Sequence, residues 1–320
     1  MFNHAAAIGA DLGRFLIKIA VVKIDGEIIA VKSYPLVQKQ TRDYLIEKLL
    51  EAVRDIRQVV AAQGINPICT GISAKGFIDH KGGVILGPDQ GILDWINVPL
   101  ARIIKQETGL PVYVDNDANM MTIAEHRFGA ARGYKNVIFV ALRTGIGGGI
   151  IINGKLYRGA NNAGGEIGQM IINCDNGTSD KGITGSYEHF ASAASIVRRF
   201  YEESGMEAGK DKKSISCKDI FELSYSNNPE ALRVVKENSE MVGIGLANLI
   251  TIFAPEIIVL GGGMSEAHDN YISMIRSSAC ANSLENCRSD LRIERAQLGA
   301  VGSLLGSAYW SMTSLAGQSI

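Results

Sequence analysis

The chain has 320 residues and a formal net charge of −1, from 32 Lys and Arg against 33 Asp and Glu. Hydrophobic residues make up 46% and charged residues 20%, as in a globular protein, and the length favours two domains. The basic residues are scattered, which excludes a nucleic-acid-binding stripe, and no apolar run of about 18 residues suits a membrane-spanning helix. Residues 1–5 lack the features of a signal peptide, and five scattered cysteines fit reduced thiols, so we expect a cytoplasmic protein.

The first part of the chain predicts a sheet with one long helix. Strands are expected before Asp11, at residues 15–22 and at residues 28–31. Asp25-Gly26 between β-branched runs predicts a hairpin with a type I′ turn. Apolar residues at helical spacing predict a helix over residues 41–63, and two further strands follow at residues 68–73 and 112–114.

A similar order of elements recurs roughly 130 residues later, which suggests duplicated halves. A strand at residues 137–142 precedes a glycine loop at 144–149, a strand at 149–152 and a hairpin turn at Asn153-Gly154. If each half is a sheet with its glycine loop at one end, the two loops can face each other across a cleft. Ligands generally bind in such crevices.

The last third predicts helices and one further strand. Residues 191–253 are mostly helical, and a strand at 255–260 ends in Gly261-Gly262-Gly263. Small residues in a final helix beginning at residue 302 allow close packing onto the first domain. We therefore expect a small α/β domain of residues 1–118 with a C-terminal helix of about residues 303–320 packed on it, and a large α/β domain of residues 119–302.

Two junctions between elements carry residues suited to phosphate and proton chemistry. Asp11 could hold a magnesium ion and Gly13 could let N–H groups approach phosphate, although a structural turn explains the same residues. Asp115, Asn116, Asp117 and Asn119 stand where a strand meets a helix. A helix cap explains one of these four side chains, and a carboxylate there could take a proton from a sugar hydroxyl.

Further candidates lie in the second half. The glycine loop at residues 144–149 could point N–H groups at an anion, although such loops also form bulges and turns. A strand follows it, so it does not match a dinucleotide-binding fingerprint. Glu166 and Glu188 are carboxylates that could accept hydrogen bonds from sugar hydroxyls, although each alone is more often a solvated surface residue.

Together these segments resemble the ROK family of sugar kinases and sugar-responsive repressors, within the actin-like ATPase superfamily. The strongest likeness runs through residues 114–119 with Glu125 following, residues 144–151 and residues 154–168. The resemblance implies an α/β fold of two actin-like (ribonuclease H-like) domains with an interdomain cleft. It also implies transfer of the γ-phosphoryl group of ATP, with Mg²⁺, to a hydroxyl of a hexose or N-acetyl hexosamine.

The resemblance also implies a role for each matched residue. Asp117 matches the catalytic base. The expected sugar ligands are Asn116, Glu166, Gln169 and Glu188, and the expected nucleotide-binding residues are Asp11, Gly13, Thr144, Gly145, Gly261, Gly262 and Gly263. A homodimer is a family expectation, with sugar and nucleotide as the other partners and with neither nucleic acid nor membrane among them.

Three departures from the family pattern bear on activity. Phe15 replaces the threonine of the first phosphate loop, and a phenyl ring offers phosphate no hydroxyl. Arg143 replaces a small residue before Thr144. Gln169, Ser179, Lys181 and Ser186 stand at the histidine and three cysteines of the family zinc motif, and nearby Cys174 and His189 cannot complete a ligand set. We therefore expect no structural zinc.

Two hypotheses remain open. The first is an ATP-dependent, glucokinase-like sugar kinase, favoured by Asp117 and by the lack of a DNA-binding module before Ile8, where family repressors would carry roughly 60 to 80 further residues. The second is a sugar-binding sensor or regulator without catalysis or a DNA-binding domain. Phe15, Arg143 and the altered zinc motif favour the second.

Overall fold

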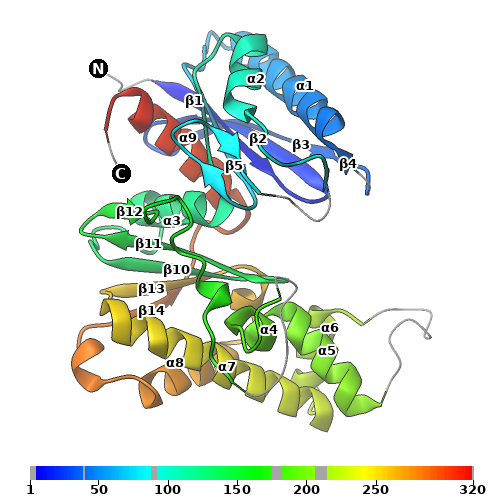
Figure 1. Ribbon diagram of the computed structural model, residues 1–320, viewed down its shortest axis with the longest axis vertical. Coiled ribbons are helices and arrows are strands. Elements are labelled where there is room, and N and C mark those ends of the chain that lie inside the picture. Colours follow the sequence, from blue (N-terminus) through cyan, green and yellow to red (C-terminus); the bar gives the residue numbers. More distant parts are fainter. Residues whose placement is uncertain (1–4, 39, 88–91, 175–181, 206–214, 319–320) are drawn as a thin grey trace. The chain divides into compact units, whose positions relative to one another are not determined.

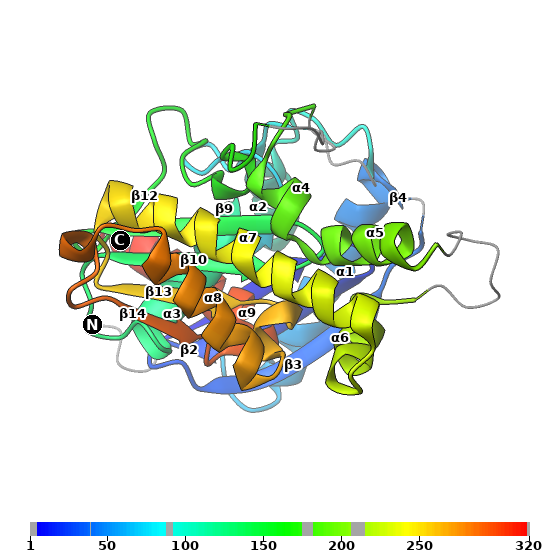
Figure 2. The same cartoon turned by 90° about the horizontal axis from the view of Figure 1, so that it is seen from below.

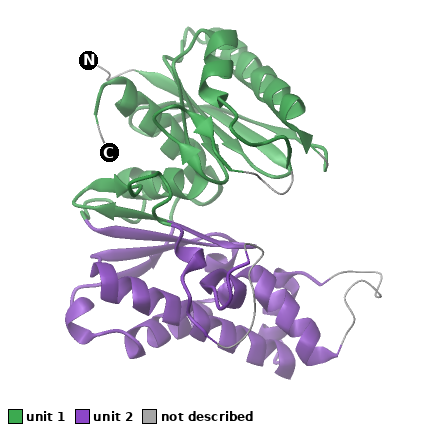
Figure 3. Cartoon of the chain, in the orientation of Figure 1, with its two compact units in different colours: residues 1–135, 149–165, 297–320 green, residues 136–148, 166–296 purple. Residues whose placement is uncertain are grey.

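The computed structural model describes residues 5–38, 40–87, 92–174, 182–205 and 215–318. The chain divides into two compact units, of which the first comprises residues 1–135, 149–165 and 297–320 and the second residues 136–148 and 166–296 (Figure 3). Residues 119–135 belong to the first unit, whereas the sequence analysis placed the domain boundary at residue 118. A compact unit need not coincide with a domain. The domain boundary at residue 118 therefore stays a prediction.

The first unit contains a five-stranded sheet of order β3-β2-β1-β5-β9. β1 pairs antiparallel with β2, and β2 with β3, whereas β1, β5 and β9 are parallel. The register aligns Asp11 of β1 with Ser73 of β5, and Ser73 with Asp115 of β9. The strands are β1 (Ala6–Leu12), β2 (Leu16–Lys23), β3 (Ile28–Pro35), β5 (Thr70–Ala74) and β9 (Val112–Asn116).

Helices cover both faces of this sheet (Figure 1). Side chains of β1 alternate, so that Ile8 joins the core beneath α1 (Arg42–Ala61) and α2 (Leu100–Thr108), while Ala7 joins the core beneath α9 (Gly302–Leu315). A Cβ at Gly9 would lie 2.1 Å from the carbonyl oxygen of Leu304, so this strand position has to be glycine for α9 to pack so closely. The unit also holds α3 (Asp117–Phe128), η4 (Gly299–Val301) and the short pairs β4 (Gln40–Thr41) with β8 (Ile92–Leu93) and β6 (Ile78–Asp79) with β7 (Val84–Ile85).

The second unit is built around three parallel strands, β10 (Val137–Leu142), β13 (Ile257–Gly261) and β14 (Arg292–Arg295). β10 and β13 are buried throughout, as their continuous apolar runs predict for parallel strands. α7 and α8 lie side by side along this unit (Figures 1 and 2). Its helices are α4 (Tyr187–Ala191), α5 (Ala193–Ser204), α6 (Cys217–Tyr225), α7 (Pro229–Phe253) and α8 (Asp269–Ala281), with η1 (Ile167–Gln169), η2 (Gly263–Glu266) and η3 (Glu285–Cys287).

Two hairpins were predicted, and the structure confirms both while correcting one turn. β11 (Ile146–Ile152) and β12 (Lys155–Tyr157) are joined by Asn153 and Gly154 with φ of 52° and 77°, the positive angles that a type I′ turn requires. β2 and β3 are instead joined by residues 24–27, and of these only Gly26 has a positive φ. The type I′ prediction at Asp25-Gly26 was therefore wrong, because the N–H of Gly26 donates to the carbonyl oxygen of Lys23 and closes a turn whose central residues, Ile24 and Asp25, both lack a positive φ.

The glycine loop predicted at residues 144–149 is shorter in the structure, because β11 already begins at Ile146. Within that strand a Cβ at Gly148 would lie 2.3 Å from the side chain of Ile167, and a Cβ at Gly149 would lie 2.1 Å from Oγ1 of Thr122. These glycines therefore allow close packing of a strand. No helix among the described residues has the length and apolarity needed to cross a membrane.

Candidate functional site

Asn116 and Asp117 mark the junction between β9 and α3. Asn116 caps the helix, since its Oδ1 accepts hydrogen bonds from the N–H groups of Ala118 and Asn119 at 2.8 and 3.4 Å. Its Nδ2 also donates to the carbonyl oxygen of Gly76 at 3.1 Å. Asp117 is the first residue of α3 and is partly exposed, at a position where the helix dipole stabilises a negative charge. The cap therefore accounts for the side chain of Asn116.

Asp11 lies at the same edge of the first sheet as Asp115, because β1, β5 and β9 run parallel. The hydroxyl of Ser73 donates to Oδ1 of Asp11 at 3.2 Å. Carboxylate oxygens of this kind are the ligands that Mg²⁺ prefers. Asp11, near the end of β1, and Asp117, directly after β9, both belong to the first unit and lie at the carboxyl ends of its parallel strands.

The turn after Asp11 differs from the simple phosphate loop predicted by its glycine. The N–H of Gly13 donates to the carbonyl oxygen of Leu16 at 3.1 Å, so that the turn itself uses this donor. Phe15 is 59% exposed, and the guanidinium of Arg14 lies 5.3 Å from the centroid of its ring. The phenyl ring of Phe15 therefore does not fill the interior of the turn.

Thr144 and Gly145 form a second turn, at the end of β10 in the second unit. Oε2 of Glu188 accepts the N–H of Ile146 at 2.9 Å, and Nε2 of Gln169 donates to Oε1 of Glu188 at 3.3 Å. A Cβ at Gly145 would lie 2.3 Å from Oε2 of Glu188, so glycine leaves room for that carboxylate. The structure thus brings together two predicted sugar ligands and a predicted nucleotide turn. Glu166 immediately precedes η1 and its carbonyl oxygen accepts the N–H of Gln169 at 3.0 Å.

The three glycines after β13 have different roles. A Cβ at Gly261 would lie 2.5 Å from the ring of Phe139, so Gly261 packs against the neighbouring strand. Gly262 has a φ of +87°, a conformation that L-residues rarely adopt. Gly263 is exposed and begins η2. These observations explain Gly261 by packing and Gly262 by turn geometry, and the nucleotide-binding role of both residues stays a prediction.

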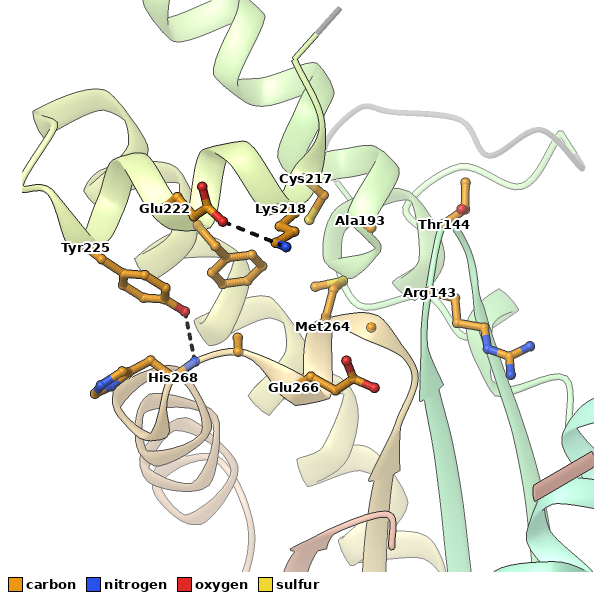
Figure 4. Close-up of a pocket in the computed structure, with 13 residues that line it drawn as sticks. Arg143, Thr144, Ala193, Cys217, Lys218, Glu222, Tyr225, Met264, Glu266 and His268 are labelled. Carbon is orange, nitrogen blue, oxygen red and sulfur yellow. Dashed lines mark hydrogen bonds and ion pairs between the residues drawn. The ribbon is translucent and has the colours of Figure 1, made fainter. Parts of the chain in front are cut away.

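A pocket of about 720 Å³ opens in the second unit, where β10 and β13 end (Figure 4). Thr144 and Gly263, both predicted to bind nucleotide, line it. Tyr225 accepts a hydrogen bond from the N–H of His268 at 2.8 Å, and the side chain of Arg143 points away from this end of the pocket (Figure 4). The other lining residues, which the sequence analysis did not single out, are Ala193, Cys217, Lys218, Phe221, Glu222, Met264, Glu266 and Ala267.

The lining of the pocket combines buried apolar side chains with exposed charged ones. Phe221 and Met264 are buried in its wall, whereas Lys218 and Glu222 are exposed and their charged atoms lie 3.9 Å apart. Burial raises the pKa of the Cys217 thiol to about 12, so this side chain is uncharged at neutral pH. Such a wall suits a flat, largely apolar ligand group with few polar contacts.

The positions of the family zinc motif carry other groups. Ser186 caps α4, and its Oγ accepts the N–H of His189 at 3.3 Å. Arg198 donates to the carbonyl oxygen of His189 at 3.0 Å. Ser179 and Lys181 lie outside the described residues. Within the described part of the chain no group of three or more His, Cys, Asp and Glu is placed to hold a metal ion, and the absence of a structural zinc stays a prediction.

Residues 7–314 match the ROK family. The chain belongs to the ROK family. A glucokinase of Halalkalibacterium halodurans is 31% identical over 310 residues, which cover 94% of this chain and 93% of the relative. A xylose repressor of Bacillus spizizenii is 28% identical over 311 residues, which cover 96% of this chain and 77% of the repressor.

Solved structures agree with this assignment. A ROK family glucokinase from Streptomyces griseus in complex with glucose and AMPPNP superposes with a TM-score of 0.82 at 30% identity, covering 97% of this chain and 100% of that chain. The expected α/β fold of the actin-like ATPase type and the glucokinase-like ROK resemblance are thereby confirmed. The roles of the individual site residues stay predictions.

Proposed function

We propose that this ROK protein transfers the γ-phosphoryl group of ATP to a hydroxyl of a hexose or an N-acetyl hexosamine. The observation that carries the proposal is the placement of Asp117, a partly exposed carboxylate at the start of α3 beside the capping Asn116. The similarity to a glucokinase over nearly the whole of both chains supports the same activity.

The carboxylate of Asp117 accepts the proton of the attacking sugar hydroxyl, which makes the hydroxyl oxygen a better nucleophile toward the γ-phosphorus. Asn116, Glu166, Gln169 and Glu188 are the proposed sugar ligands, since carboxylate oxygens can accept hydrogen bonds from hydroxyl groups and side-chain amide N–H groups can donate to hydroxyl oxygens. Mg²⁺ offsets the charge of the polyphosphate when it is bound, and Asp11 is the carboxylate proposed to hold it. Positioning then supplies most of the rate acceleration.

The pocket beside Thr144 and Gly263 is the proposed site of the adenosine group of ATP. Its volume of about 720 Å³ lies in the range of small-molecule sites, and the buried Phe221 and Met264 offer an apolar wall to a base. Tyr225 and His268 stand at one end of the pocket, while Arg143 points away from them (Figure 4). This pocket therefore supports a nucleotide as the phosphoryl donor.

A sugar-binding sensor without catalysis is the second candidate. The similarity to a xylose repressor over 96% of this chain favours it, and so does Phe15, which leaves the first turn without the hydroxyl that the family provides. In that case the same residues bind the sugar, and binding changes the conformation or partners of the protein without turnover.

The deciding experiment incubates the protein with ATP, Mg²⁺ and a panel of hexoses and N-acetyl hexosamines, and couples ADP release to a readout. The proposal expects turnover with at least one sugar and its loss, by about 100-fold or more, in Asp117→Asn. Asp43→Asn is the matched control, because Asp43 also occupies the first turn of a helix, α1. It should leave turnover unchanged.

The result also separates the two candidates. If a sugar raises the melting temperature and the wild type shows no turnover, the sensor is supported, because a ligand that binds only the native state stabilises it. Equal turnover in Asp117→Asn and the wild type would exclude Asp117 as the catalytic base.

A further inference from the structure

A buried ion pair joins Asp115, two residues before the proposed catalytic Asp117, to Arg158. Nη2 and Nε of Arg158 contact Oδ2 of Asp115 at 2.7 and 2.8 Å. The side chains are only 12% and 3% exposed, so water can solvate neither charge fully and each depends on the other. Both residues belong to the first unit, with Asp115 in β9 and Arg158 directly after β12.

The other oxygen of Asp115 holds the turn from β9 into α3. Its Oδ1 accepts the N–H of Asn116 at 2.7 Å and Nδ2 of Asn119 at 3.1 Å. Asn116 in turn caps α3, in which Asp117 is the first residue. One carboxylate therefore fixes both the backbone before Asp117 and the first helical turn after it, while its second oxygen binds Arg158.

Arg158 fixes the loop of residues 158–164, as Asp115 fixes the turn before α3. Its carbonyl oxygen accepts the N–H of Gly164 at 2.9 Å and so closes residues 158–164 into a compact loop. Its guanidinium lies 5.5 Å from the ring centroid of Trp310 in α9, which fixes the plane of the group. Asn162 within the loop donates to Oδ1 of Asp79 at 3.4 Å. The loop leads within two residues to Glu166, a proposed sugar ligand.

We propose that Asp115 and Arg158 form a positioning pair. The pair keeps the turn that carries Asp117 at a fixed distance and orientation relative to the loop that leads to Glu166. This inference rests on the proposed function. Neither residue takes part in the chemistry itself. Because a shift of about 1 Å in a reacting group can cost about 100-fold in rate, loss of the pair should lower kcat and raise KM for the sugar. The bonds of Asp115 reach Asn116, Asn119 and Arg158 and not Asp11, and the proposed adenosine pocket lies in the second unit, so KM for ATP should change less than twofold.

The test compares Arg158→Met, Asp115→Asn and the double variant with the wild type. Each single variant should lower kcat about 100-fold at saturating sugar and ATP, and the double variant should lower it no further, because either change breaks the same pair. Lys32→Met is the matched control. It removes the cation of the Lys32–Asp55 pair, which joins β3, at the opposite edge of the sheet from β9, to α1. It should leave all three kinetic constants unchanged.

Arg158→Lys is included in case Arg158→Met fails to fold. It keeps the buried positive charge and loses the second N–H contact to Asp115. A folded Arg158→Lys should still show a reduced kcat, by about 10-fold, with KM for ATP unchanged. Thermal unfolding establishes that each variant is folded. If folded Arg158→Lys and Asp115→Asn keep the kcat and the sugar KM of the wild type, or if KM for ATP rises in parallel with KM for the sugar, the positioning role is wrong.

Failure of the proposed function gives a different result. A wild type that binds a sugar without turnover overturns the kinase proposal, and the pair is then tested by sugar affinity in titration calorimetry, where Arg158→Met should weaken binding about 10-fold and Lys32→Met should not. A wild type that neither turns over nor binds any sugar of the panel overturns both.

Discussion

Gly145, a predicted nucleotide-binding residue, lies against Glu188, a predicted sugar ligand of the same unit. A Cβ at this position would lie 2.3 Å from Oε2 of Glu188, the atom that accepts the N–H of Ile146. Glycine was predicted here as a donor to phosphate. The structure adds a reason that concerns the sugar ligand, because the carboxylate of Glu188 can reach β11 only where position 145 lacks a side chain.

Gly145→Ala should therefore displace the Glu188 carboxylate and leave the N–H of Ile146 without its partner. We expect the free energy of unfolding to fall by about 1 to 3 kcal/mol, since a buried donor loses its hydrogen bond. Urea unfolding measures this change. Gly263→Ala is the control, because an added Cβ there meets no atom within 4 Å, and its unfolding should match the wild type. Equal stability of Gly145→Ala and the wild type would contradict the assignment.

Two cysteines should differ in reactivity because of burial. Burial raises the pKa of Cys217 to about 12, whereas Cys174 is exposed. The thiolate is the reacting form, so a raised pKa lowers the reactive fraction of Cys217 at pH 8. With iodoacetamide at pH 8, peptide mapping should find Cys174 alkylated faster than the half-buried Cys217, and alkylation of Cys217 should speed up as the pH rises or the protein unfolds. Labelling of Cys217 at the same rate as Cys174 in the native protein at pH 8 would contradict the raised pKa of Cys217.

At the scale of elements, α3 is held at both ends by side chains that the family pattern already contains. Asn116 caps its first turn, and Glu125 near its end accepts the N–H groups of Gln297 and Leu298 at 3.0 and 2.9 Å through Oε1, and of Ala130 at 2.8 Å through Oε2. Glu125 is 2% exposed, so these bonds compensate its burial. It thereby ties α3 to the segment that leads into α9, a contact that the sequence analysis did not predict.

The cap of α3 offers a test that separates stability from function. Asn116→Ala and Asn228→Ala should each lower the free energy of unfolding by about 1 kcal/mol, because each removes a helix cap. Only Asn116→Ala should also reduce turnover, since Asn228 caps α7 and is not among the proposed site residues. Urea unfolding and steady-state kinetics measure the two effects. A similar loss of turnover in both variants would show that stability alone accounts for the change.

At the scale of the whole molecule, the family expectation is a homodimer. Light scattering on the eluting peak of a size-exclusion column should then give a mass of twice the 34.4 kDa of one chain. The mass should stay the same over a tenfold range of loading concentrations if the association is tight. A mass equal to that of one chain at every concentration would contradict the expectation.

Much of the fold could be predicted because its signals are local. The strand at residues 137–142, the helices up to Phe253 and the Asn153-Gly154 hairpin follow from apolar runs, helical spacing and residues that tolerate positive φ. The extent of the glycine loop at residues 144–149 could not be predicted. Glycine permits both a turn and a closely packed strand, and the neighbours of Gly148 and Gly149, Ile167 and Thr122, decide between them.

The candidate site likewise has features that the sequence predicts and features that only the tertiary structure shows. The sequence alone predicts the residue types and their order, among them Asp11, Asn116, Asp117, Glu166 and Glu188, because each motif of this family is a short contiguous segment of the chain. Tertiary structure alone revealed the Asp115–Arg158 pair, the bond between Gln169 and Glu188, and the pocket lined by α6 and η2. These partners are distant in sequence, and no local pattern records which charges are buried together or which strands align in register. Burial and pairing are properties of packed elements, so they appear only once the chain has folded.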